Sequence, residues 1–127
     1  MKIKFRFLFF MWTIAMLTVS SIPHLQTIST HFTWVDKIAH FAEYSIWTLF
    51  FLLMLKQEKK ISNQKNLLLI VVSFGILLMI IDEGHQLFIP GRSADFLDMV
   101  ADFSGLILMT FIFQRIQKNR LNLRSKR

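Results

Sequence analysis

Four largely apolar runs limit what this chain can fold into. They extend over residues 5–22, 35–55, 67–88 and 96–113, and short polar segments separate them. A run of about 20 such residues can cross the hydrocarbon of a bilayer as a helix, which satisfies all of its backbone hydrogen bonds internally. We therefore predict an all-α polytopic membrane protein, a four-helix transmembrane bundle that forms a single domain over residues 1–127.

The composition agrees with a bilayer environment and excludes several other classes of protein. Hydrophobic side chains make up 54% of the 127 residues, and the mean hydropathy is +0.47. The absence of cysteine excludes disulfides, thiolate metal ligands and a cysteine nucleophile. The first run follows basic residues, as the core of a signal peptide does, but its length and bulk favour an uncleaved span.

Positive charges are distributed unevenly around the four runs. One side of the predicted spans has only Lys37, near the start of the second run, and Arg92, in the third connection. All other Lys and Arg residues lie near the termini or between the second and third runs. Because cytoplasmic loops carry an excess of basic residues, this pattern predicts that both termini are cytoplasmic. The net charge of +7 then reflects topology and contact with anionic headgroups. The chain has no nucleic-acid-binding module, so we expect no nucleic-acid partner.

Acidic residues and histidines show the opposite distribution. All acidic residues except Glu58, and all four histidines, lie in or near the predicted extracytoplasmic halves of the spans. Ionisable groups are costly at membrane depth, so they usually face the bundle interior, pair with one another and mark a functional site. We expect that site at the extracytoplasmic ends of the second, third and fourth helices.

The second run begins with a polar stripe. At about 100° per residue, Asp36, His40 and Glu43 share one helix face, with Tyr44 at its edge. A capping box of Thr33 and Asp36, with Lys37 reaching the headgroups, would explain the helix start but not the deeper His40. His40 could be a general base, a metal ligand or a hydrogen-bonded interior group.

The third run ends in a polar face and a turn. Asp82, Glu83 and Gln86 lie within about 100° of one another on a helix. Pro90 and Gly91 then predict a turn that brings Arg92 to the mouth of the site. The Arg92 guanidinium either pairs with Glu83 or Asp95, or binds a phosphate or carboxylate ligand.

The fourth run begins with three aspartates on one stripe. Asp95 could cap the helix, and Asp98 would suit the positive end of the helix dipole. Asp102 lies about two turns inside, where an unpaired carboxylate would be protonated or strongly destabilising. Gly105, next to this stripe, would let a neighbouring helix approach closely.

Three separated motifs on successive spans carry a family resemblance. They read Asp36-Lys37-x-x-His40-Phe41-x-x-Tyr44, then Asp82-Glu83-x-x-Gln86-x-Phe88-x-Pro90-Gly91-Arg92, then Asp95-x-x-Asp98-x-x-x-Asp102-x-x-Gly105. Over residues 36–105 the chain resembles the VanZ-like family of small bacterial membrane proteins, whose founding members are associated with low-level resistance to teicoplanin. The resemblance implies a location in the bacterial cytoplasmic (inner) membrane. One position departs from the pattern, because the family often has Asn where this chain has Asp102.

Our leading hypothesis is a VanZ-like protein of the cell envelope with a polar pocket on the extracytoplasmic side. That pocket would bind or modify an envelope lipid or a lipid-linked cell-wall intermediate, and so affect teicoplanin susceptibility. The candidate catalytic residues are His40, Asp36, Glu83 and Asp98, where Asp36 or Glu83 would orient His40. The candidate substrate-binding residues are Arg92, Lys37, Tyr44, Gln86, Asp82 and Asp102.

Two other interpretations stay open. In the first, the protein is a non-catalytic membrane factor whose polar residues form a structural interhelical network. Ion translocation is less favoured, because the cytoplasmic half supplies no matching ionisable relay. No motif such as His-x-x-x-His occurs, so the sequence assigns no metal and no cofactor, although His40 with carboxylates could hold a divalent ion.

Overall fold

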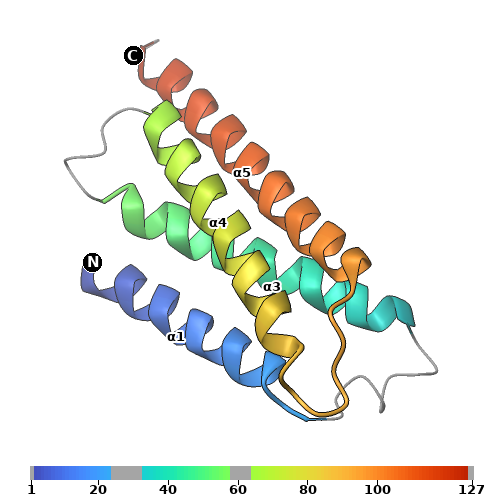
Figure 1. Cartoon of the computed structure of the whole chain (residues 1–127). Helices are drawn as coiled ribbons and strands as arrows, with labels where there is room; N and C mark the ends of the chain where they lie inside the picture. The colour runs from blue at the N-terminus through green and yellow to red at the C-terminus, as the bar shows by residue number, and fades with distance from the viewer. Residues whose placement is uncertain (1, 24–32, 58–63, 126–127) are drawn as a thin grey trace.

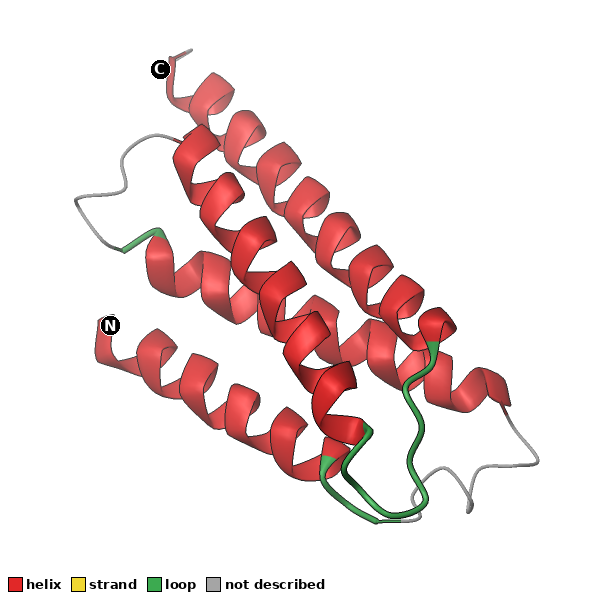
Figure 2. Cartoon of the chain, in the orientation of Figure 1, coloured by secondary structure: helices red, strands yellow, loops and turns green. Residues whose placement is uncertain are grey.

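The computed structural model describes residues 2–23, 33–57 and 64–125, and within these ranges it is all-helical (Figures 1 and 2). Its helices are α1 (Lys2–Ser20), α3 (Thr33–Leu55), α4 (Gln64–Gln86) and α5 (Phe96–Ser125). All four are long and apolar enough to cross a membrane. The predicted fold class is therefore confirmed.

Helix α5 differs most from its predicted span. We expected the fourth apolar run to end at residue 113, whereas the helix continues to Ser125. Hydropathy reports where the apolar segment ends, but the following residues include good helix formers and no proline or glycine. At 1.5 Å per residue, the 30-residue helix is about 45 Å long, which exceeds the roughly 30 Å of bilayer hydrocarbon.

Helix α3 lies at the centre of the arrangement. It packs most extensively against α5 and next against α1, whereas α4 packs on α5 and more lightly on α3. Each helix therefore contacts the next one in sequence, but the main partner of α3 is α5. Helix α1 begins and α5 ends on the same side of the bundle (Figure 1).

Aromatic side chains join α1 to α3. The ring centroids of Phe9 and Phe51 are 4.8 Å apart, and Trp47 packs against both rings. Two indole N–H groups also cross this interface: Trp12 donates to the backbone carbonyl of Glu43 at 3.1 Å, and Trp47 to the Thr13 hydroxyl at 3.0 Å. These bonds satisfy both indoles, which would otherwise be costly to bury in an apolar contact.

Gly105 sets the separation of α3 and α5. A Cβ atom at this position would overlap the Phe41 carbonyl oxygen and lie 2.8 Å from Ser45 Oγ. The predicted close approach of a neighbouring helix is thus confirmed, and the neighbour is α3. The contact lies one turn beyond Asp102, so it places the polar stripes of the two helices within reach of each other.

Candidate functional site

A polar cluster occupies the end of the bundle where α3 and α5 begin and α4 ends, which we call the polar end. The polar cluster comprises Asp36, Lys37, His40, Asp82, Glu83, Gln86, Asp95, Asp98 and Asp102. Six of its members are buried: Asp98, Asp102 and Gln86 are fully enclosed, and His40, Asp82 and Glu83 are at most 6% exposed. The structure therefore gathers on one end most of the side chains that we selected from the sequence.

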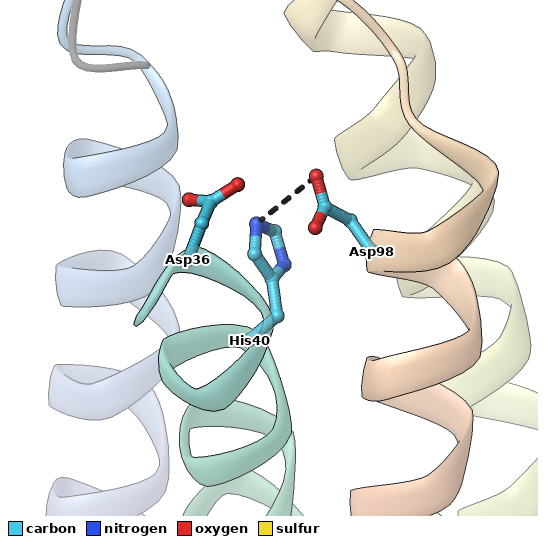
Figure 3. A group of neighbouring side chains, drawn as sticks. All are labelled: Asp36, His40 and Asp98. Carbon is cyan, nitrogen blue, oxygen red and sulfur yellow. Dashed lines mark ion pairs between the residues drawn. The ribbon is translucent and has the colours of Figure 1, made fainter. Parts of the chain in front are cut away.

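His40 lies between two carboxylates of α5. Its Nδ1 is 3.0 Å from Asp102 Oδ1, and its Nε2 is 3.9 Å from Asp98 Oδ2 (Figure 3). Asp98 and Asp102 are four residues apart, so they lie one turn apart on the same face of α5. The hydrogen-bonded carboxylate at Nδ1, with a second carboxylate near Nε2, fixes the orientation of the imidazole.

The orienting partner of His40 differs from the one we expected. We named Asp36 or Glu83 for this role, but the residue in hydrogen-bond contact with the ring is Asp102, whose carboxylate accepts from Nδ1 and which we had placed in the substrate-binding set. Figure 3 shows Asp36 on the Nε2 side of the ring, at the level of Asp98. His40 is also the partner that an ionised Asp102 requires at this depth.

Lys37 forms ion pairs with α5 instead of reaching the headgroups. Its ammonium group donates to carboxylate oxygens of Asp95 and Asp98 and lies 3.7 Å from Asp36 Oδ2. The hydrogen bond from Lys37, together with one from the Leu97 backbone amide, lowers the pKa of Asp95 below its usual value. The proposed capping box cannot be assessed, because the Thr33 side chain lies outside the described residues.

Asp95 caps α5, as predicted, and Glu83 holds this cap in place. The Asp95 side chain accepts a hydrogen bond from the Leu97 amide at 2.8 Å, and its carbonyl accepts one from the Asp98 amide at 3.0 Å. Glu83 Oε2 accepts the Asp95 amide itself at 3.0 Å. The pairing of Asp95 with Lys37 was not predicted from the sequence, although Asp95 shares a helix stripe with Asp98.

The turn after α4 has the predicted form. The Arg92 amide donates to the Ile89 carbonyl at 3.1 Å, and Gly91 has a φ of 74°. Pro90 followed by a glycine with positive φ is the signature of a type II turn. Glu83 and Asp95, the expected partners of the Arg92 side chain, bind other groups. The buried Arg92 Nε has no hydrogen-bond partner within the described part of the chain.

Several buried oxygen and nitrogen atoms of the cluster, and the hydroxyl of Tyr44 on α3, lack hydrogen-bond partners among the described residues. They are Tyr44 Oη, Asp82 Oδ1, Glu83 Oε1, both amide atoms of Gln86, Asp98 Oδ2 and Asp102 Oδ2. Most buried polar atoms in proteins have a partner, and each one without costs about 1–3 kcal/mol. So many unpaired atoms in one place favour a site that accepts water, an ion or a polar ligand.

An apolar groove of about 330 Å³ lies between α4 and α5, near the cluster. It is lined by Ile76, Met79 and Ile80 of α4 and by Phe96, Met99, Val100 and Phe103 of α5. Ile80 precedes Asp82 by two residues, and Met99 follows Asp98 directly. An amphiphile could therefore place an apolar chain along these helices while its polar part reaches the cluster.

Comparison with known proteins yields one match. A family model described as VanZ/LLP1 matches residues 2–117, which include α1, α3, α4 and most of α5. Searches of the curated proteins and of the solved structures each gave no match. The matched region extends well beyond residues 36–105, over which the three sequence motifs lie.

Proposed function

Because this chain belongs to the VanZ-like family, we propose that it binds and modifies the polar head of an envelope lipid or a lipid-linked cell-wall intermediate. Its four helices make it a multi-pass membrane protein. In this proposal the polar end faces the extracytoplasmic side of the bacterial cytoplasmic membrane, with both termini in the cytoplasm. The asymmetry of the basic residues supports that orientation.

The observation that carries the proposal is the placement of His40. Asp102 holds Nδ1 from the deeper side, which leaves Nε2 directed toward the beginnings of α3 and α5 (Figure 3). The 3.9 Å from Nε2 to Asp98 is longer than a hydrogen bond, so Nε2 is not committed to that carboxylate. Nε2 is therefore the ring atom through which His40 meets a bound head group, and the carboxylates keep it in position.

The remaining features fit the two parts of an amphiphile. Arg92, in the turn between α4 and α5, has a buried Nε without a partner among the described residues, and a guanidinium binds phosphate or carboxylate groups well. The apolar groove between α4 and α5 suits an acyl or prenyl chain that enters from the bilayer. Together these features favour an anionic head group and a sideways approach from the membrane.

The test is a complementation experiment in a strain that lacks the gene. Cells expressing wild type, His40→Gln or His85→Gln are compared for lipid profile, cell-wall precursors and teicoplanin susceptibility. His85→Gln is the matched control, because His85 is exposed on α4 and its Nε2 forms a hydrogen bond with the Ser21 hydroxyl, at 3.1 Å. We expect His40→Gln to reproduce the deletion and His85→Gln to behave as wild type. A His40→Gln profile equal to wild type, with equal protein in the membrane, would rule out the proposal.

A non-catalytic structural network is the second candidate. It is favoured by one observation: the bonds of Lys37 with Asp95 and Asp98, and that of His40 with Asp102, all join α3 to α5. The amount of membrane-inserted protein separates the two functions. If His40→Gln and Asp98→Asn lose the phenotype only because the protein disappears from the membrane, the network is structural. If the protein persists and the lipid profile changes, the cluster acts on a ligand.

A further inference from the structure

We propose that His40, Glu83 and Asp102 bind a divalent transition-metal ion, of the Zn²⁺ or Mn²⁺ type, inside the polar end. Each of the three side chains is buried, and each offers a ligand atom within 4.8 Å of the other two. They come from three different helices, α3, α4 and α5. The inference rests on the proposed function and adds to it a cation at the same site.

The ligand atoms need only small movements to reach metal-binding distances. Ligands about 2.0–2.2 Å from a tetrahedral zinc ion lie roughly 3.3–3.6 Å from one another. His40 Nδ1 and Asp102 Oδ1 are 3.0 Å apart, slightly closer than this, and the widest separation in the group is at most 4.8 Å. Shifts of about half an ångström per side chain would therefore complete the site.

Unpaired atoms point to a ligand at this position. Glu83 Oε1 and Asp102 Oδ2 have no hydrogen-bond partner in the described part of the chain, although Glu83 is 4% exposed and Asp102 is fully buried. Gln86, one turn beyond Glu83 on α4, is also fully buried with both amide atoms unpaired. Its amide oxygen could fill a further coordination position or bind a metal-bound water.

Charge also favours the set of His40, Glu83 and Asp102 over a second possible metal-binding set beside it. A second possible set, Asp36, His40 and Asp98, lies on the Nε2 side, but Lys37 already pairs with both of its carboxylates. Among the described residues, Glu83 and Asp102 have no Lys or Arg within ion-pair distance. Two carboxylates beside a neutral imidazole have a charge of −2, which a divalent cation neutralises, whereas a protonated His40 offsets only half.

The rest of the cluster would serve as the outer shell of such a site. Metal-ligating histidines commonly donate their other ring N–H to a carboxylate, which fixes the tautomer. Asp98 Oδ2, 3.9 Å from His40 Nε2, is placed for that bond after a small movement, and Lys37 holds the other Asp98 oxygen. With the cation on Nδ1, the remaining imidazole proton is on Nε2, where Asp98 accepts it and orients the ring.

The experiment is metal binding by the purified full-length protein in detergent, without lipid. After removal of metal with a chelator, Zn²⁺ and Mn²⁺ are titrated separately, and bound metal per chain is measured by mass spectrometry. We expect one ion per chain. We expect Glu83→Gln and Asp102→Asn to weaken binding by more than roughly 100-fold, since loss of an outer-shell partner alone costs 10–100-fold.

Two control variants make the result specific. Asp36→Asn removes a member of the alternative set, and His85→Gln removes an exposed histidine that could bind zinc adventitiously. Both should bind as wild type does. The inference is overturned if folded wild-type protein binds neither ion. It is also overturned if Asp36→Asn or His85→Gln abolishes binding while Glu83→Gln still binds the ion as wild type does.

Circular dichroism and gel filtration establish that each variant is folded. If Asp102→Asn does not fold, Glu83→Gln gives the decisive result. The amide oxygen of the new glutamine side chain can still accept the hydrogen bond from the Asp95 backbone amide, so we expect this variant to fold. Since binding is measured without lipid, failure here leaves the proposed function standing. Metal binding together with an unchanged His40→Gln lipid profile would instead refute the proposed function and keep the cation site.

Discussion

The ion pairs of Lys37 should be a major source of stability for the α3–α5 contact. Its ammonium group binds Asp98, which is fully buried, and Asp95, whose side chain is 38% exposed. Lys37→Met keeps most of the side-chain volume but leaves the Asp98 carboxylate buried without its cation. Breaking a buried pair in this way costs about 3–5 kcal/mol, and we expect about 3 kcal/mol because Lys37 is itself 17% exposed.

A double-mutant cycle separates the ion pair from other effects of the substitution. Asp98→Asn alone should cost about 1–2 kcal/mol, since Lys37 keeps its bond with Asp95. In the double variant no charge is left buried at position 98. Its total cost should therefore stay at about 3 kcal/mol, below the roughly 4–5 kcal/mol that the two single costs add up to. The expected coupling energy is therefore about 1–2 kcal/mol in favour of the native pair.

The assay is reversible unfolding in mixed micelles with increasing dodecyl sulfate, followed by fluorescence of the three tryptophans. Lys118→Met is the matched control, because Lys118 is exposed on α5 and its loss should change the unfolding free energy by less than about 0.5 kcal/mol. A cost below 1 kcal/mol for Lys37→Met, or strict additivity in the cycle, would refute the interpretation that this pair joins the helices.

Two further predictions concern α5. Gly105→Ala should lower the unfolding free energy by about 1–3 kcal/mol in the same assay, because the new methyl group overlaps the Phe41 carbonyl oxygen. Gly84→Ala is the control: space is open around its Cβ, so the change should be neutral or slightly stabilising. Equal costs for the two variants would contradict the close approach of α3 and α5 at Gly105. The Lys37 hydrogen bond lowers the folded-state pKa of Asp95 below the unfolded value of 3.8, so this carboxyl stabilises the fold above pH 3.8 and that contribution is lost as pH falls through the folded value. The loss of stability between pH 5 and 3 should be smaller in Asp95→Asn, which retains a good helix cap, than in wild type, and parallel pH profiles would count against this role.

Features that depend on a single segment could be predicted from the sequence. The four spans, the cap at Asp95, the turn at Pro90 and Gly91 and the close approach at Gly105 all follow from local residue preferences or from apolar length. The structure agrees on each of these points.

Features that depend on how helices face one another could not be predicted in the same way. A helical wheel gives the stripe of Asp36 and His40, but not the rotation of α3 relative to α5. That rotation decides that Asp102 contacts His40 and that Lys37 points to Asp98. Short connections favour contact between helices consecutive in sequence, but they do not reveal that α5 is the main partner of α3, where the small Gly105 lets it pack closely.

The pairing of α3 with α5 also constrains how the chain is assembled during synthesis. Helix α3 leaves the ribosome about 40 residues ahead of α5, with Lys37 and His40 already in its first two turns. Until Asp98 and Asp102 follow, these two side chains have no partner on α5 and are costly to expose to acyl chains. We therefore expect the α3 segment to stay beside the insertion machinery or at the headgroup level until the last helix arrives.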